Sequence, residues 1–227
     1  MAVPIFKARI NPAMFRCAAE AEIIGRILAA FGELEYMTID LSARVLDRRD
    51  AILRALYRIR TTSARIDAAD AMMASAFFSA GLGDDYATMM RALRLSLRIR
   101  NQYAHCNWGD DQGPTQAGLF FADLRRSAEA ITGFDHEWKH VSVPLLQQQE
   151  AHFVHAQDWL YYLDGELSRR TGRRLFLAFP RPAAERGDPT PTPAHLAMEA
   201  KREAARARRR AAGQHSTSGK PEPSDQT

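Results

Sequence analysis

The sequence has very few cysteines and lacks long apolar runs, and both features narrow the classes of protein to consider. Two cysteines, Cys17 and Cys106, among 227 residues are too few for a disulfide framework. No run of about 18 or more apolar residues occurs, so we expect no membrane-spanning helix and no membrane partner. The first residues lack a basic stretch followed by an apolar one, so we expect no secretory signal. Together these features favour a cytoplasmic protein, because free thiols persist in a reducing compartment.

A strong charge of one sign is also missing from most of the chain. The formal net charge is only +4, from 31 Lys and Arg against 27 Asp and Glu. Residues 181–227 hold 9 of the basic and 6 of the acidic residues, so the rest of the chain is nearly neutral. The basic balance of the whole chain therefore says little about nucleic-acid binding by its folded part.

Apolar residues recur at three- and four-residue steps along five stretches, which is the pattern of helices with one buried face. The spacing predicts helices over about residues 17–46, 50–60, 63–80, 85–106 and 145–170. Residues 1–15 contain two prolines and are expected to be extended. The predicted fold class is all-α, an up-and-down bundle of four to five helices.

The stretches outside these helices have their own composition. Residues 109–114 are predicted to form a loop, and residues 116–124 and 138–143 a short hairpin before the last helix. After Pro180, prolines and then an Ala/Arg/Glu-rich run predict a linker and a basic, disordered tail. We therefore divide the chain into an N-terminal extension (1–16), a helical bundle (17–176) and a linker with tail (177–227). Residues 181–227 are expected to contribute little to stability.

The helix predicted over residues 85–106 contains the most distinctive chemistry. At about 100° per residue, one stripe of this helix carries polar side chains and a neighbouring stripe carries mostly apolar ones. The polar stripe is Arg91, Arg94, Arg98, Asn101 and His105, and the apolar one is Leu93, Leu97, Arg100 and Ala104. Arg100 is the exception on its stripe, and an arginine facing a core needs a carboxylate partner. Glu35, on the core-facing stripe of the first predicted helix, is the candidate partner.

Arginine, histidine and an orienting amide are the groups needed to cleave a phosphodiester without a metal. His105 can exchange a proton near neutral pH, Arg100 can bind a phosphate, and Asn101 can orient His105 or the phosphate. Arg100 and His105 are five residues apart, which is about 140° on an ideal helix. Either the last turn unwinds near Cys106, or a second copy of the chain completes the site. We favour the second arrangement, which predicts a homodimer.

The run Arg100-Asn101-x-x-x-His105, at the end of the fourth predicted helix, resembles the signature of the HEPN superfamily. The resemblance covers about residues 17–170. It implies a four- or five-helix bundle whose motifs face each other in a cleft between two copies. It also implies a metal-independent endoribonuclease of toxin–antitoxin or phage-defence systems, with no cofactor, RNA as substrate and an antitoxin protein as a further partner. Some members carry a modified tyrosine two residues after the histidine, where this chain has Asn107.

Other interpretations of the same residues remain open. The chain can be a catalytically silent HEPN-like bundle that dimerises and binds a nucleotide or a protein. Arg94 and Arg98 are candidate RNA-binding residues, although such a stripe is more often a solvated face. Cys106 lies beside His105, but the sequence shows no group that would orient a thiol nucleophile.

The histidine pairs and the basic tail also invite functional interpretations. His136 and His140, and His152 and His155, have spacings that a metal can use, but no cysteine or carboxylate pattern completes either site, so we predict no metal. The run of three arginines at 208–210 is typical of a solvated tail, and it can add salt-sensitive affinity for RNA.

Overall fold

The computed structural model describes residues 11–110, 118–124, 137–172, 178–183 and 192–193 of the chain. The helices in this part are α1 (Pro12–Arg16), α2 (Ala18–Val45), α3 (Arg49–Leu56), α4 (Thr62–Ser79), α5 (Gly83–Ala104) and α7 (Val143–Arg170). The strands are β1 (Cys106–Asp110), β2 (Leu119–Asp123), β3 (Trp138–Val141) and β4 (Thr192–Pro193). The described part is thus mostly helical, as the apolar spacing predicted.

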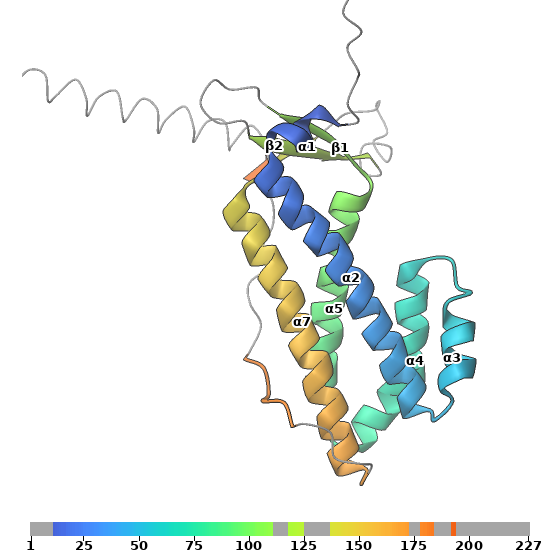
Figure 1. Cartoon of the computed structure of the whole chain (residues 1–227). Helices are drawn as coiled ribbons and strands as arrows, with labels where there is room; N and C mark the ends of the chain where they lie inside the picture. Colours follow the sequence, from blue (N-terminus) through green and yellow to red (C-terminus); the bar gives the residue numbers. More distant parts are fainter. Residues whose placement is uncertain (1–10, 111–117, 125–136, 173–177, 184–191, 194–227) are drawn as a thin grey trace, which may run out of the picture.

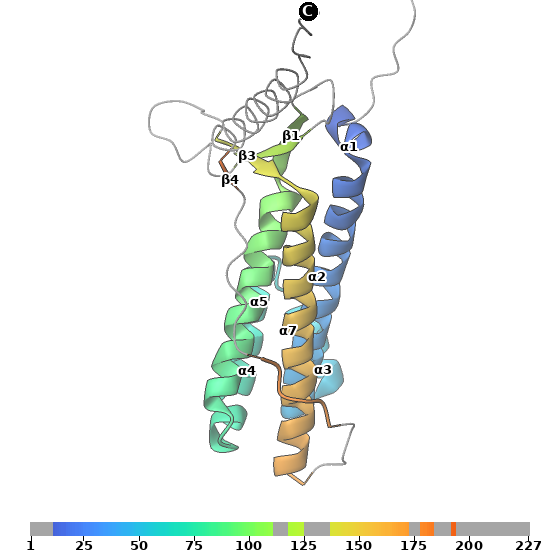
Figure 2. The same cartoon turned by 90° about the vertical axis from the view of Figure 1, so that its left-hand side faces the viewer.

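The long helices α2, α5 and α7 lie side by side, with the small sheet and α1 at one end (Figures 1 and 2). We call this the sheet end and the opposite end of the bundle the far end. Helix α2 runs away from the sheet end, α5 returns to it and α7 runs away again, whereas α3 and α4 flank the far half (Figure 1). No helix in the described ranges is both long enough and apolar enough to cross a bilayer.

The core lies between α2, α5 and α7, and α4 closes it against α2 and α5. Its side chains recur at three- and four-residue steps, so each helix turns one stripe inward. The most deeply buried large residues include Ile27, Phe31, Leu34, Met73, Phe77, Met89, Leu93, Phe153, Trp159 and Leu163. Each large apolar side chain buried in this way contributes roughly 1.5–3 kcal/mol of transfer free energy.

The helix boundaries follow from local chemistry. Helix α7 begins after Ser142, whose hydroxyl accepts a hydrogen bond from the Leu145 backbone at 3.4 Å, and Pro144 lies in its first turn. The turn between α4 and α5 contains Gly81 with a φ of 71°, a left-handed conformation that favours glycine. Helix α5 ends at Ala104, so the end predicted for it from the loop-forming residues that follow is confirmed.

A small antiparallel sheet in the order β1-β2-β3-β4 covers the sheet end. Trp108 of β1 pairs with Phe121 of β2, and Phe121 pairs with Lys139 of β3. The β2–β3 pairing confirms the predicted hairpin. Strand β1 was not predicted. It includes Gly109 and Asp110, which were predicted to lie in a loop. The bundle therefore has a small sheet that an all-α class leaves out.

The N-terminal part of the described chain also differs from the prediction. Residues 1–15 were expected to be extended, but Pro12–Arg16 form the short helix α1. Ala13 is buried in the core cluster, and Arg16 forms an ion pair with Asp110 of β1. Because these contacts attach α1 to the sheet, the folded unit includes residues that the sequence assigned to an N-terminal extension.

Two described segments after α7, residues 178–183 and 192–193, contact the rest of the fold. Arg181 forms an ion pair with Asp85 of α5, and β4 pairs with Lys139 and His140 of β3. The sequence predicted that residues 181–227 contribute little to stability, yet their described parts are attached to α5 and to the sheet. The disorder predicted for the basic tail concerns residues 194–227, which lie outside the described residues.

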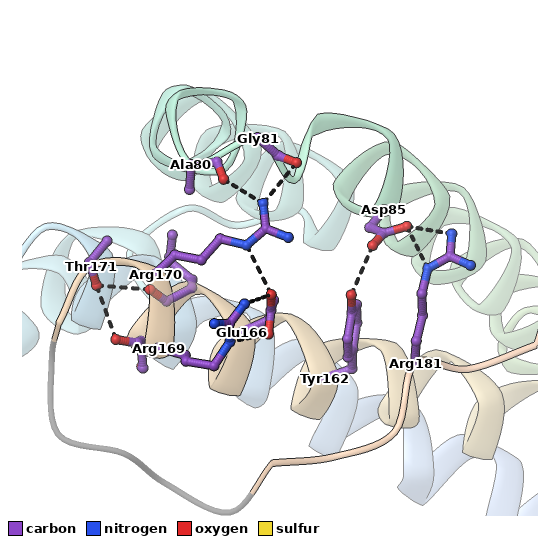
Figure 3. A network of polar contacts seen from close by, with 11 residues as sticks. Ala80, Gly81, Asp85, Tyr162, Glu166, Arg169, Arg170, Thr171 and Arg181 are labelled. Carbon is purple, nitrogen blue, oxygen red and sulfur yellow. Dashed lines mark hydrogen bonds and ion pairs between the residues drawn. The ribbon is translucent and has the colours of Figure 1, made fainter.

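A cluster of charged side chains joins the far end of α7 to the turn between α4 and α5 (Figure 3). Glu166 accepts hydrogen bonds from Arg169 at 2.6 and 2.9 Å and from Arg170 at 2.9 Å. Arg170 also donates to the carbonyl oxygens of Ala80 at 2.7 Å and Gly81 at 3.1 Å. The hydrogen bonds from Arg169, together with those from Arg170, lower the pKa of Glu166 from 4.5 to about 2.

This lowered pKa predicts a loss of stability in acid. A carboxyl group whose pKa is lower in the folded state stabilises the fold fully above its unfolded pKa, near 4.5, and progressively less as the pH falls towards about 2. Glu166→Gln should therefore flatten the dependence of the unfolding midpoint on pH between these values. Chemical denaturation at a series of pH values measures it, with the exposed Glu33→Gln as the control. An unchanged pH dependence in Glu166→Gln would contradict the assignment.

Candidate functional site

The candidate site lies where α5 ends at the sheet, and Tyr103 fixes this end of the helix in place. The Tyr103 hydroxyl donates to the side-chain oxygen of Gln149 on α7 at 2.6 Å. Its ring stacks on Trp108 of β1, with centroids 5.7 Å apart, and meets the edge of Phe121 of β2 at 5.4 Å. Burial raises the pKa of the Tyr103 hydroxyl, so this group stays protonated and acts as a donor. These contacts fix the end of α5 against α7 and the sheet.

His105 is the residue at which the chain leaves the helix. It is the C-cap of α5, with a φ of −136° and a ψ of 37°, and strand β1 begins at the next residue. Its side chain is exposed. The last turn of α5 therefore ends before His105. Because His105 is outside the helix, the ideal angle of about 140° between it and Arg100 no longer applies.

Arg100 lies one turn before the end of α5 and is half-buried. Leu93 and Leu97, on the same stripe, are both buried, so the position of Arg100 on a core-facing stripe is as predicted. Its Nη1 donates to Oδ1 of Asn101 at 3.0 Å. The structure thus brings Arg100 and Asn101 together, and within the described ranges no carboxylate forms an ion pair with Arg100.

Glu35 does not hold Arg100, and this corrects the predicted pairing. Its carboxylate accepts a hydrogen bond from Nη1 of Arg65 on α4 at 2.5 Å, and both side chains are largely buried. Glu35 lies in the far half of α2, whereas Arg100 lies close to the sheet end of α5. At a rise of about 1.5 Å per residue, the two residues are roughly 15–20 Å apart along the bundle. The sequence correctly predicted which face of α2 carries Glu35. It did not predict the level of Glu35 along the bundle, which differs from that of Arg100.

The two arginines predicted to bind RNA are both exposed on α5. Arg94 lies against two carboxylates of α4, with Nη2 at 2.7 Å from Asp70 and 3.3 Å from Asp67. These carboxylates offset its charge, which makes Arg94 a poor partner for a phosphate. Arg98 is exposed and lies one turn closer to the sheet end, on the same side of α5 as Asn101.

The thiol of Cys106, next to His105, is not prepared for nucleophilic attack. Burial raises the pKa of this thiol to about 12. Its Sγ donates to the carbonyl oxygen of Tyr103 at 3.4 Å, which stabilises the protonated form. Because the thiolate is the reactive species, this environment argues for a structural role.

The raised pKa gives a direct prediction for thiol labelling. At pH 8 a thiol with a pKa near 12 is ionised in only about one molecule in ten thousand. Because Cys17 is buried and Cys106 is half-buried, both thiols of the native protein should react with a disulfide reagent far more slowly than after denaturation. The release of the chromogenic thiol with time measures this difference, and fast labelling of Cys106 in the native protein would contradict the assigned environment.

The histidines with metal-like spacing are used in other contacts. His152 Nε2 lies 3.2 Å from the carbonyl oxygen of Ala92, and Trp159 donates to Nε2 of His155 at 3.1 Å. The His140 ring packs against a phenylalanine of β2, and His136 falls outside the described residues. In the described ranges, no group of three or more His, Cys, Asp or Glu side chains has the arrangement to hold a metal ion.

The residues that position the site were missed by the sequence analysis. Tyr103, Trp108 and Phe121 form the aromatic contact between α5 and the sheet, and Gln149 holds the tyrosine hydroxyl. The spacing of Tyr103 could have identified it as core-facing, because it lies four residues after the buried Ile99 on the same stripe of α5. Nothing in the sequence paired β1 with β2, so the two ring partners of Tyr103 could not be named.

Comparisons of the chain with family models, with curated proteins and with solved structures find no match. A function for this chain therefore has to be argued from its own residues and from the motif resemblance.

Proposed function

We propose that this protein is a metal-independent endoribonuclease of the HEPN type, with its site at the sheet end of α5. The observation that carries the proposal is the placement of the motif residues. Arg100 is hydrogen-bonded to Asn101 on the last full turn of α5, and the exposed His105 follows at the C-cap. A half-buried guanidinium and an accessible imidazole at the same end of α5 suit a phosphodiester whose cleavage needs charge neutralisation and proton transfer.

Each motif residue has a distinct role in this proposal. His105 removes the proton from a ribose 2′-hydroxyl or donates one to the leaving 5′-oxygen, and Arg100 neutralises the charge that develops on the phosphate. Asn101 holds Arg100 in place through the bond at 3.0 Å. Arg98 contacts a neighbouring phosphate from its exposed position on α5. The reaction yields a 2′,3′-cyclic phosphate and a 5′-hydroxyl.

The proposal includes a homodimer whose two motifs share one cleft, and an antitoxin protein that controls it. A second copy places another Arg100 and His105 near the first pair, as the resemblance implies. Sedimentation at tens of micromolar should give about twice the chain mass of 25.5 kDa. A mixture of Arg100→Ala and His105→Ala chains should regain part of the lost activity if one site uses residues from both copies. A monomer at these concentrations would remove the dimer from the proposal.

The enzyme proposal is tested by incubating the purified protein with structured and unstructured RNA in excess EDTA. We expect the wild-type protein to cut and His105→Ala to cut at least about a hundredfold more slowly. If the wild-type protein cuts neither RNA, the silent HEPN-like bundle becomes the better account. If both proteins cut equally, the activity lies elsewhere and the assigned site is wrong.

A further inference from the structure

The segment that follows α7 lies against a group of side chains from α5 and α7 (Figure 3). Arg181 donates to Oδ1 of Asp85 through both Nε, at 3.0 Å, and Nη2, at 2.6 Å. The other oxygen of Asp85 accepts from the Tyr162 hydroxyl at 3.0 Å. Hydrogen bonding from Arg181, together with that from Tyr162, lowers the pKa of Asp85. The Asp85 carboxylate is thus bonded through one oxygen to Tyr162 of α7 and through the other to Arg181 of the C-terminal segment.

Two aromatic contacts accompany this ion pair. The guanidinium of Arg181 lies over the ring of Trp159, 5.6 Å from its centroid. Two residues earlier, the ring of Phe179 stacks on Tyr161 with centroids 5.0 Å apart and an angle of 21° between the planes. Pro180 lies between them, and its ring fixes its own φ at roughly −65° and restricts the backbone of the residue before it.

The α5 and α7 side chains that contact the segment belong to the bundle, whereas the segment itself lies on the surface of the bundle. The Asp85 side chain is only 15% exposed and Trp159 is buried, but the Arg181 side chain is 62% exposed and Phe179 is 42% exposed. The receiving side chains come from two long helices that pack against each other. The contacts resemble those of a short peptide bound to the surface of a folded domain.

We propose that Asp85, Trp159, Tyr161 and Tyr162 form a docking site for an extended protein segment with an aromatic residue two positions before an arginine. In the isolated chain the site is filled by its own Phe179-Pro180-Arg181. A partner protein with the same pattern binds by displacing this segment. The proposal is independent of the ribonuclease site, because the docking site lies in the far half of the bundle, on the far-end portions of α5 and α7.

The test measures binding of a fluorescent peptide with the sequence of residues 177–184 to the full-length chain, by fluorescence anisotropy. The double variant Phe179→Ala/Arg181→Ala empties the site, and adding Asp85→Asn removes its carboxylate. We expect the double variant to bind the peptide at least about tenfold more tightly than the wild type, whose site is filled. The triple variant should lose about tenfold or more of that affinity, because a charge-assisted hydrogen bond has been removed.

Two controls keep the result interpretable. A peptide with alanine in place of its arginine should bind the double variant as weakly as the original peptide binds the triple variant. Circular dichroism verifies that each variant is folded, and Arg181→Ala alone, a single change at an exposed side chain, replaces the double variant if that one is not. Absence of binding to a folded variant with an emptied site, or equal binding with and without Asp85, would overturn the proposal.

Discussion

Replacing His105 with alanine is expected to reduce RNA cleavage by about 10²- to 10⁴-fold, the usual contribution of a general acid or base. The thermal midpoint should change little, because His105 is exposed and lies outside the helix. Initial rates on a labelled RNA in excess EDTA measure the effect. Arg91→Ala is a matched control, because Arg91 is an exposed residue of the same helix, bonded to Thr88 far from the motif. A similar loss of activity in Arg91→Ala would show that the effect is not specific to the site.

Arg100→Ala should remove a comparable share of activity, and Arg100→Lys should recover only part of it. Lysine retains the positive charge but lacks the planar fork that binds two phosphate oxygens. It also cannot reproduce the geometry of the bond from Arg100 to Asn101. Full activity in Arg100→Lys would mean that only charge matters at this position and would weaken the assigned role.

Replacing Tyr103 with alanine is expected to lower the free energy of unfolding by about 3–5 kcal/mol, as for other large buried aromatic residues. The change removes the ring contacts to Trp108 and Phe121 as well as the bond to Gln149. Tyr103→Phe keeps the ring and removes the hydroxyl alone, so it should lower the free energy by only about 1–3 kcal/mol, the cost of leaving the buried Gln149 oxygen without this donor. Denaturant titration of the three proteins measures both values.

The two Tyr103 variants also separate stability from the positioning of the site. If Tyr103 holds the end of α5 in place, Tyr103→Phe should remain folded and keep most of its cleavage activity. A loss of less than about 1 kcal/mol in Tyr103→Ala would show that the junction between α5 and the sheet does not depend on this ring.

The long helices were predictable because each of them buries a stripe of apolar side chains with the period of a helix. The burial of Leu93 and Leu97 and the half-burial of Arg100 follow from the same period. The period gives the direction of a side chain around its helix, but it gives no information on which residues of two helices lie at the same height. For this reason Glu35 was assigned to Arg100, whereas the fold brings it to Arg65.

The short elements were missed for different reasons. Strand β1 has the sequence Cys-Asn-Trp-Gly-Asp, without regular alternation, and it forms through pairing with β2 across a connection in the chain. Asp85 lies in the first turn of α5, where acidic residues are favoured. Its ion-pair partner is Arg181, almost a hundred residues later in the chain. Contacts between a few residues at such separations leave no periodic signal in a sequence.

The most direct test of the central claim is the chemical identity of the RNA ends after cleavage in excess EDTA. Mass spectrometry of the products should find 2′,3′-cyclic phosphates and 5′-hydroxyls with the wild-type protein, and almost none with His105→Ala. These ends require attack by the 2′-hydroxyl, the step assigned to His105 and Arg100. Products with 3′-hydroxyl and 5′-phosphate ends, or identical cyclic products from His105→Ala, would contradict the account.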